Sequence, residues 1–582
     1  MPSPPVDPDA PDPSAETSPP AAGSSSASRA ATVAAGILSS RVVGFLRERA
    51  VAHFFGVGAH ADVFRVALRG PNILQNLLGE GTISAAFIPI YSRMLHEARE
   101  EDAGRFAGAI FGLLLALVAA LTLLGVLFAG PIVAVLAPGF LADAGAGAGA
   151  EAGTVGVDRF GLAVACVRII FPMTGILVLS AWALGVLNSH RRFFVPYFAP
   201  VLWNVAIIAA LFGAAARWME RPLAGEAAAA LGVATESRLV VAACWGALAG
   251  GLLQFLVQLP QVVRVLRGFR LSLSPRVEGV REALGAFGPV VAGRGVGQLS
   301  TYLDLFLASF LAAGALGALG YASQIYLLPV SLFGLSVAAA ELPELSRIGE
   351  RERDAFLDRV HRSLGQVAFL VVPTFVGYLA FGYPIVGLLF QTGDFGPADT
   401  WLIYFVLCAY TLALPTSTAS RLLQNSFYAL GDTKTPAKVA VLRVVLAAAV
   451  AVPVMFLLDR VAVTELVDAP PADEPLRLGA VGLALGTAVA SWFELWRLRV
   501  ILGRRVEGFG LPLGRAAKMA GLAGAAAVPA AGLWTLLPDW HVALDAAVVV
   551  IAYALAYLVG AYLLKFPELE AWAGRLLRRL GR

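Results

Sequence analysis

The organisation of this chain is decided by the segment Ser40-Arg41-Val42-Val43-Gly44-Phe45-Leu46-Arg47-Glu48-Arg49 and by a second segment, which contains Pro71-Asn72-Ile73-Leu74-Gln75-Asn76-Leu77-Leu78-Gly79-Glu80-Gly81. Both segments are apolar enough to form membrane helices, yet both carry charges inside the apolar sequence. A charged side chain at the centre of a bilayer costs roughly 3 kcal/mol on the insertion scale. Arg41, Arg47, Arg65 and Arg69 would together cost about 12 kcal/mol if they faced lipid, so we expect them to face water or an anionic group.

The polar residues of the second segment recur at helical spacing. They lie at positions i, i+4, i+7, i+11 and i+15 and comprise Arg65, Arg69, Asn72, Asn76 and Glu80. Residues at these spacings share one face of a helix, so the sequence predicts a continuous polar stripe. Pro71 lies within the stripe and is predicted to kink the helix, because proline has no backbone N–H group to donate.

The charges of the first segment allow two interpretations. Arg41 and Glu48 are seven residues apart and share a helix face. In one interpretation the arginines line a basic cavity. In the other they are structural: Arg41 pairs with Glu48 to hold two helices together, while Arg47 and Arg49 extend from a helix end to the membrane surface.

The composition excludes most soluble classes of protein. Of 582 residues, 58% are hydrophobic and only 14% are charged, which is typical of a polytopic membrane protein. The formal net charge of +4 is too small to indicate nucleic-acid binding. The three cysteines lie in apolar runs without metal-ligand spacing, so neither a metal site nor a disulfide framework is predicted.

The chain is predicted to be all-α, with about fourteen transmembrane helices. A span needs about 20 apolar residues, and suitable runs lie at 30–55, 61–92, 106–137, 160–187, 194–216, 238–263, 283–313, 317–346, 363–390, 400–429, 437–458, 478–501, 516–537 and 543–564. Arginine and lysine concentrate in alternate loops. By the positive-inside rule, this alternation predicts that both termini are cytoplasmic.

A short internal repeat predicts how the spans are grouped. Phe87-Ile88-Pro89-Ile90-Tyr91-Ser92-Arg93 ends the second span, and Glu341-Leu342-Pro343-Glu344-Leu345-Ser346-Arg347 ends the eighth. Copies six spans apart have the same orientation, as in parallel repeats. We therefore expect two six-helix lobes around a central cavity. The predicted divisions are a disordered cytoplasmic tail at 1–28, lobes at 29–263 and 264–501, and two further helices with a basic cytoplasmic tail at 502–582.

Several of these motifs together resemble a known family. Residues 40–48, Pro71-Asn72 with Glu80-Gly81, residues 87–91 and the loop Asp432-Thr433-Lys434-Thr435-Pro436 resemble the MurJ/MviN lipid II flippases of the multidrug/oligosaccharidyl-lipid/polysaccharide exporter superfamily. The resemblance implies a two-lobed transporter for lipid II, the undecaprenyl-pyrophosphate-linked precursor of peptidoglycan. It also implies roles for Arg41, Arg47, Asn72 and Glu80, and Glu48 keeps an acid where the family often has aspartate.

Two family positions that are often basic hold glutamine here, namely Gln75 and Gln324. The chain has an additional intramembrane arginine, Arg294, which lies between two glycines in the seventh predicted span, with Gln298 one turn further on. We expect Arg294 to replace the missing charge in the cavity. The substrate-binding set predicted from the sequence is therefore Arg41, Arg47, Glu48, Arg65, Arg69, Asn72, Gln75, Glu80, Arg294 and Gln324.

Asp304 is an ionisable residue deep in the seventh predicted span. It could pair with Arg294, couple transport to a cation, or pack as a polar residue between helices, and the resemblance implies a monovalent-cation role in some relatives. No cofactor or metal is expected. Coupling to sodium, to protons or to the membrane potential is left open.

The function predicted from these features is transport of lipid II from the inner to the outer leaflet of the bacterial cytoplasmic (inner) membrane by alternating access. The chain is not predicted to be an enzyme, because its six histidines form no catalytic cluster with carboxylates. The alternative is an exporter of another lipid-linked oligosaccharide or amphipathic substrate. The expected partners are lipid II, membrane lipids and the cell-wall synthesis machinery, with no nucleic acid.

Overall fold

The computed structural model describes residues 23–146, 157–218, 226–348, 352–470, 475–537 and 542–570. Within these ranges the chain is helical and contains no β-strand, only one isolated bridge between Ala462 and Arg477. The predicted all-α class is confirmed. Of the predicted tail at 1–28, residues 1–22 lie outside the described residues, and residues 23–28 belong to the first helix.

The first half of the chain forms eleven helices. They are α1 (Gly23–Phe55), α2 (Ala59–Leu78), α3 (Glu80–Ala86), α4 (Ile88–His96), α5 (Glu100–Leu127), α6 (Ala129–Leu136), α7 (Pro138–Ala146), α8 (Arg159–Ser189), α9 (Phe194–Trp218), α10 (Glu226–Leu256) and α11 (Leu259–Val265).

The second half begins with α12 (Val280–Ala308). It continues with α13 (Ala315–Pro329), the π-helix η2 (Val330–Leu335), α14 (Ser336–Ile348), α15 (Arg353–Phe390), α16 (Pro397–Thr411), α17 (Leu414–Ala429), α18 (Lys434–Leu458), the short η3 (Val463–Glu465), α19 (Gly479–Arg505), α20 (Leu513–Leu536) and α21 (Val542–Leu563).

Among the described residues, eleven helical segments are long and apolar enough to cross a membrane. They coincide with eleven of the predicted spans. The three remaining predicted spans fall on α1, on α2 to α4 and on α12, each of which carries charged residues within its apolar sequence. The predicted total of fourteen accordingly stays a prediction.

The second predicted span is interrupted beyond Pro71, where the sequence predicts only a kink. Helix α2 continues through Pro71 to Leu78, and the chain leaves helical geometry at Gly79, where ψ is −143°. A Cβ atom on Gly79 would lie 2.4 Å from the carbonyl oxygen of Gln75, so only glycine fits there. The break turns the chain between α2 and α3, at the end of the polar stripe.

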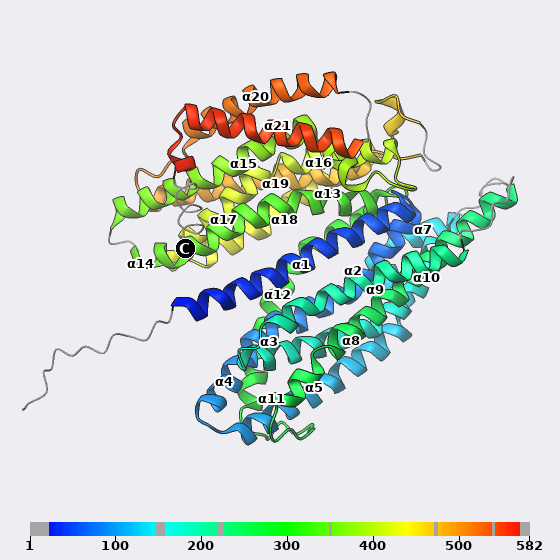
Figure 1. Cartoon of the computed structure of the whole chain (residues 1–582), viewed down its shortest axis with the longest axis vertical. Coiled ribbons are helices and arrows are strands. Elements are labelled where there is room, and N and C mark those ends of the chain that lie inside the picture. Colours follow the sequence, from blue (N-terminus) through cyan, green and yellow to red (C-terminus); the bar gives the residue numbers. More distant parts are fainter. Residues whose placement is uncertain are drawn as a thin grey trace, which may run out of the picture.

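The helices form two groups that meet at one end of the molecule (Figure 1). In this view α2 to α11 lie below, α13 to α21 lie above, and α1 runs between them. We call the end that holds the loops 97–99, 266–279 and 506–512 the basic end, and the end that holds 56–58, 309–314 and 391–396 the opposite end. The two groups converge toward the opposite end and separate toward the basic end.

The hydrophobic cores follow the same arrangement. A single core at the opposite end contains residues of both groups, including Phe55, Tyr321 and Phe390. Toward the basic end, the core around Phe106 contains residues of the first group and α12, whereas the core around Phe427 contains residues of the second group alone. The predicted lobe boundaries at 263 and 501 stay predictions.

The segment 266–279 connects the two groups and is fastened along α5. Gly104, Gly108 and Gly112 lie at i, i+4 and i+8, and a Cβ on each would lie 1.8 to 2.3 Å from a carbonyl oxygen of the connector. The connector backbone therefore needs three glycines on one face of α5.

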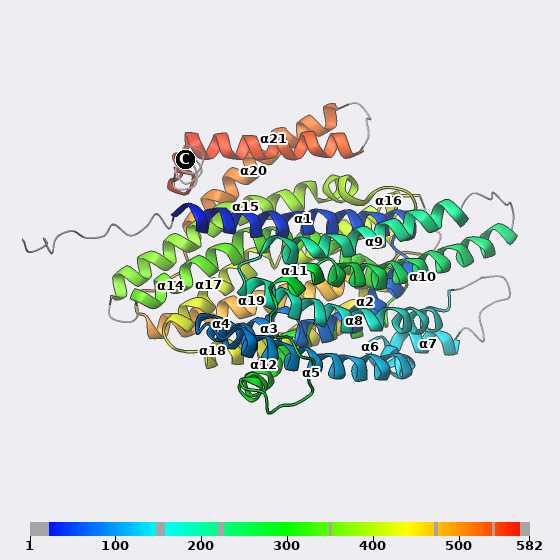
Figure 2. The same cartoon turned by 60° about the horizontal axis from the view of Figure 1, so that its bottom comes forward.

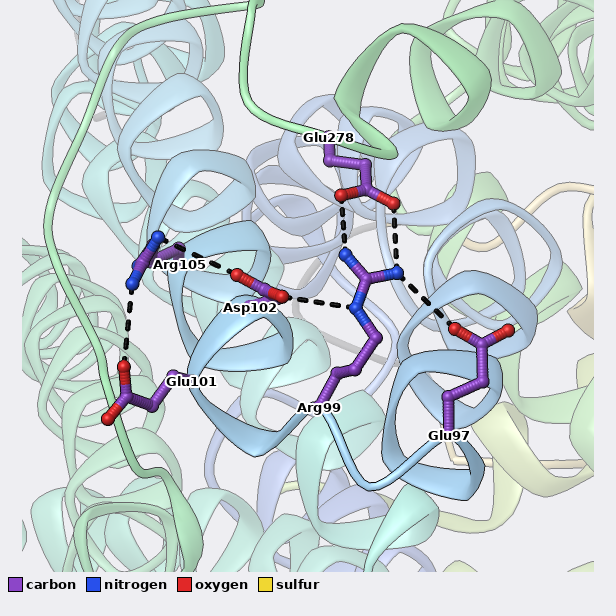
Figure 3. A network of polar contacts seen from close by, with 6 residues as sticks. All are labelled: Glu97, Arg99, Glu101, Asp102, Arg105 and Glu278. Atoms are coloured by element: carbon purple, nitrogen blue, oxygen red, sulfur yellow. Dashed lines mark hydrogen bonds and ion pairs between the residues drawn. The ribbon is translucent and has the colours of Figure 1, made fainter.

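Ion pairs fasten the far end of the connector (Figure 3). Arg99 donates to both carboxylate oxygens of Glu278, at 3.0 and 2.5 Å. The same network includes Glu97, Glu101, Asp102 and Arg105. Hydrogen bonding from the Arg99 guanidinium lowers the pKa of Glu278 from its ordinary value.

Candidate substrate-binding site

Glu48 of α1 holds two arginines together. Its Oε1 accepts from Nη2 of Arg47, and its Oε2 accepts from Nη2 of Arg65 of α2 at 3.2 Å. All three side chains are at most 19% exposed. The Arg47–Glu48–Arg65 cluster is thus a shielded ion triad that retains one net positive charge.

Aromatic rings complete the surroundings of the two guanidinium groups. Arg47 lies over Trp203 of α9, with its carbon atom Cζ 4.9 Å from the ring centroid. Arg65 lies over Tyr321 of α13, at 4.3 Å. The cluster therefore joins α1 and α2 to a helix of the second group. The Nε groups of both arginines are buried and have no hydrogen-bond partner among the described residues.

The predicted pairing of Arg41 with Glu48 is not present in the structure. Arg41 is exposed, and its Nη1 donates to the hydroxyl of Ser331 in η2 at 3.3 Å. Glu48 is instead committed to Arg47 and Arg65. The structure thus brings Arg47, Glu48 and Arg65 together and leaves Arg41 about two helical turns closer to the basic end.

Arg69 extends the basic surface toward α12 and α16. It is exposed, and its charge interacts with Tyr302 and Asp304 of α12 and with Tyr410 of α16. Asn72 and Gln75 are half-buried on α2. On α13, Gln324 is also half-buried, and its Oε1 has no hydrogen-bond partner within the described ranges.

Arg294 of α12 contacts the break that follows α2. Its Nη1 donates to the carbonyl oxygen of Asn76 at 3.2 Å, one residue from Gln75. A Cβ on Gly81 would lie 1.5 Å from Nη2 of Arg294, so the guanidinium rests directly on that glycine. Glu80 is exposed nearby and interacts electrostatically with Arg294. The structure thus places Arg294 beside the break near Gln75, and its role as a replacement charge stays a prediction.

Sequence reasoning did not identify the contacts that join the groups at the opposite end. Asp62, at the start of α2, is buried and accepts from the backbone N–H groups of Gly314 and Gly317, both at 2.7 Å, at the N-terminus of α13. Arg49 donates to the carbonyl oxygens of Leu388 and Leu389 at the end of α15. The only signal for Asp62 in the sequence was its position in the first turn of a helix. Its hydrogen-bond donors are about 250 residues away in the chain, so the sequence could not identify them.

A second charged site lies between α12 and the second group; sequence reasoning identified its Asp304 but not the partners of that residue. Asp304 of α12 and Arg443 of α18 line a cavity of about 100 Å³ together with Thr487 of α19. Arg443 also pairs with the buried Glu494 at 3.2 Å, and Glu494 accepts from Gln424 at 2.9 Å. The carboxylate of Asp304 interacts electrostatically with the positive charges of Arg69 and Arg443. The predicted pair between Asp304 and Arg294 is not present.

Solved structures with the same fold are transporters. A lipid II flippase MurJ in an inward closed conformation matches with a TM-score of 0.66 and 22% identity, over 91% of this chain and 99% of that chain. An inward-facing multidrug resistance MATE transporter of the MOP superfamily matches with a TM-score of 0.56 and 16% identity, over 81% and 96% of the two chains. The chain therefore shares the fold of these two proteins.

Sequence comparison identifies the family. The family model described as "Lipid II flippase MurJ" matches residues 51–555. The lipid II flippase MurJ of Burkholderia cenocepacia is 32% identical over 419 residues, 70% of this chain and 74% of that protein. A probable lipid II flippase MurJ of Rhizobium meliloti is 33% identical over 415 residues, 70% and 71% of the two chains. The chain belongs to the MurJ family of lipid II flippases, a family of transporters.

Proposed function

We propose that this protein moves lipid II from the inner to the outer leaflet of the bacterial cytoplasmic membrane. Membership of the MurJ family and the names of its curated relatives support this substrate. The polyprenyl tail would remain in lipid while the polar head group passes between the two helix groups, and enzymes of cell-wall synthesis would use the delivered precursor.

The observation that carries the proposal is the Arg47–Glu48–Arg65 cluster. A lipid-linked pyrophosphate is polyanionic, and a guanidinium group binds phosphate oxygens through a fixed fork of N–H donors while staying charged. Glu48 orients both guanidinium groups without neutralising them fully. Arg41, Arg69 and Arg294 would add charge between the cluster and the basic end.

Alternating access is supported by the unequal packing at the two ends. The groups share one core at the opposite end and have separate cores at the basic end. A head group would therefore reach the arginines from the basic end. The concentration of arginine there agrees with a cytoplasmic location for this end, and we propose that both termini lie on that side.

We propose that transport is coupled through Asp304 to protons or to the membrane potential rather than to sodium. Apart from Asp304 itself, only Thr487 among the described residues brings a side-chain oxygen to the lining of the cavity that Asp304 shares with Arg443, and a bound metal cation needs several oxygen ligands. Transport measured with imposed gradients tests this proposal. Wild type should ignore sodium, and Asp304→Asn should lose its dependence on pH. Acceleration of the wild type by a sodium gradient would contradict it.

The function is tested by rescue of a bacterium whose own lipid II flippase is switched off. Wild type should restore exposure of lipid II on the outer leaflet, whereas Arg65→Ala and Arg65→Lys should not, because lysine lacks the planar fork. Arg347→Ala removes an exposed arginine at the end of α14 and serves as the matched control. If well-expressed wild type fails to rescue, the cargo is another lipid-linked oligosaccharide, and Gln75 and Gln324 become the residues that explain the difference.

A further inference from the structure

A polar cavity lies at the basic end, apart from the arginine cluster. Its volume is about 480 Å³, and it is enclosed by the first turns of α15, the start of α20 and the segment that follows α21. Figure 2 shows α20 and α21 lying outside α15 as a separate layer. The lining residues are Asp358, His361, Arg362, Gln366, Arg515, Pro567 and Glu568.

The wall of this cavity is built by α15. Its four lining residues share one helix face, because they are spaced at i, i+3, i+4 and i+8. They are Asp358, His361, Arg362 and Gln366. The ring of His361 is held in place, because its Nε2 lies 2.7 Å from the carbonyl oxygen of Gly510 and the ring stacks on Phe509.

Glu568 is buried in this cavity with half of its carboxylate unsatisfied. Its side chain is 7% exposed, and its Oε1 lies 3.7 Å from Nη1 of Arg515. Its Oε2 is buried and has no hydrogen-bond partner among the described residues. A buried carboxylate oxygen without a donor costs free energy, and native structures nearly always satisfy such atoms. The chemistry of the site therefore calls for a donor from a bound molecule.

Two guanidinium groups provide the complementary charge. Arg362 is exposed and forms no hydrogen bond or ion pair within the described part of the chain, and Arg515 has only its long contact with Glu568. With Asp358 and Glu568 as the acids, the charged lining residues sum to zero. A site of this kind suits a molecule that carries one positive and one negative charge.

The position of the cavity along the apolar helices is where the head groups of a surrounding bilayer would lie. It is placed at the ends of three apolar spans, Arg353–Phe390, Leu513–Leu536 and Leu544–Leu563. Large apolar side chains are exposed beside it, including Leu513, Tyr562, Leu563 and Leu564. A molecule held in the cavity could lay acyl chains along these residues.

We propose that this cavity binds the head group of a zwitterionic aminophospholipid. Arg362 and Arg515 contact its phosphate, which guanidinium groups bind through charge-assisted hydrogen bonds. Glu568 accepts from its ammonium group, which supplies the donor that Oε2 needs, and Asp358 faces the same group from α15. The lipid links α15 to α20 and α21.

The test uses the full-length protein in detergent, with native mass spectrometry and thermal unfolding as readouts. Phosphatidylethanolamine, phosphatidylglycerol and inorganic phosphate are titrated separately. We expect phosphatidylethanolamine to bind and to raise the melting temperature, phosphatidylglycerol to bind about tenfold more weakly, and inorganic phosphate to have no effect. Equal binding of the two lipids, or stabilisation by phosphate alone, would overturn the proposal.

Substitutions of residues that line the cavity test whether the lipid binds there. Arg362→Ala removes an exposed side chain without an internal partner, so its fold should be intact, and the affinity for phosphatidylethanolamine should fall about tenfold, as expected for one charge-assisted hydrogen bond. Glu568→Gln should weaken phosphatidylethanolamine but not phosphatidylglycerol. Arg347→Ala, an exposed arginine outside the cavity, is the control. Unchanged affinity in Arg362→Ala would show that the lipid binds elsewhere.

Discussion

Glu48 provides the counter-charge for the two most shielded arginines of the site. It contacts both Arg47 and Arg65, so Glu48→Gln would leave two guanidinium groups close together without a counter-charge. Removing one partner of a buried ion pair typically costs about 3 kcal/mol or more. We expect a clearly lower melting temperature for purified Glu48→Gln and little rescue of a flippase-depleted bacterium.

Glu80→Gln is the matched control for stability. Glu80 is exposed and forms no ion pair within the described residues, so its substitution should leave the melting temperature nearly unchanged. If Glu48→Gln were as stable as wild type, the two arginines would not depend on Glu48.

Gly81 offers a way to move Arg294 without replacing it. A Cβ at this position would overlap Nη2 of Arg294, and a flexible guanidinium group can swing aside. Gly81→Ala should therefore fold but rescue as poorly as Arg294→Ala. Gly213→Ala is the control, because nothing lies within 4 Å of a Cβ at that position. Full rescue by both Gly81→Ala and Arg294→Ala would mean that the position of Arg294 is unimportant for transport.

Among the elements, the connector 266–279 is held by backbone contacts that a single methyl group would disturb. A Cβ on Gly108 would lie 2.2 Å from the carbonyl oxygen of Arg270, and backbone cannot swing aside as a side chain does. Overpacking of this kind typically costs about 1–3 kcal/mol. We expect Gly108→Ala to release the connector, with faster tryptic cleavage after Arg267, Arg270 and Arg276.

The control for the connector is Gly130→Ala, where a Cβ meets nothing within 4 Å. Its tryptic pattern should match that of wild type. Cleavage of Gly108→Ala at the wild-type rate would show that α5 does not hold the connector.

The same connector should loosen in acid. The pKa of Glu278 is lowered by the hydrogen bonds from Arg99, so the folded state binds the proton less well than the unfolded state does. The ion pair contributes fully above the ordinary pKa of glutamate and is lost as the pH falls through the lowered value. Hydrogen exchange in 273–279, corrected for its intrinsic rate, should rise in that acidic range. In Glu278→Gln the rise should be absent.

At the scale of elements, the sequence predicted the apolar helices well and their interruptions poorly. Apolar runs and arginine-bearing loops place the spans, because burial in lipid acts on each segment separately. At the break, Gly79 leaves helical geometry in a conformation where a Cβ would lie too close to the carbonyl oxygen of Gln75, and no local pattern announces it. The local pattern predicted a kink at Pro71, where helix α2 continues, and gave no signal at Gly79.

At the site, too, the sequence predicted what depends on neighbouring residues and not what depends on contacts between helices. Helical spacing correctly placed Arg65 and Arg69 on one stripe, but it could not tell which charge pairs with which. Glu48 pairs with Arg47 and Arg65 rather than with Arg41, because α2 packs beside α1 and offers the closer guanidinium. The pairing of Arg443 with Glu494 depends on α18 packing against α19, so it too lay beyond sequence reasoning.

For the whole molecule, transport by alternating access requires the opposite end to open. That end is closed by Asp62 on the N-terminus of α13 and by Arg49 on the end of α15. A helix N-terminus attracts a carboxylate through its free N–H groups, so these contacts must break and form again in each cycle. A covalent link at the same place should stop the cycle.

Ala61 and Gly317 provide the position for such a link. A Cβ on Gly317 would lie 3.5 Å from the Cβ of Ala61, within the range of a disulfide. In a variant whose native Cys166, Cys244 and Cys408 are replaced by alanine, Ala61→Cys with Gly317→Cys should form a disulfide on oxidation. Outer-leaflet exposure of lipid II should then cease, and a reductant should restore it.

The control pair is Met173→Cys with Gly251→Cys in the same background. A Cβ on Gly251 would lie 3.8 Å from the Cβ of Met173, and both residues belong to the first helix group. This disulfide should form equally well and leave transport unchanged, because it links helices that move together. If the Ala61–Gly317 link forms and transport continues, the lipid does not pass through an opening between α2 and α13. The two groups would then have to separate elsewhere, which the shared core around Phe55, Tyr321 and Phe390 opposes.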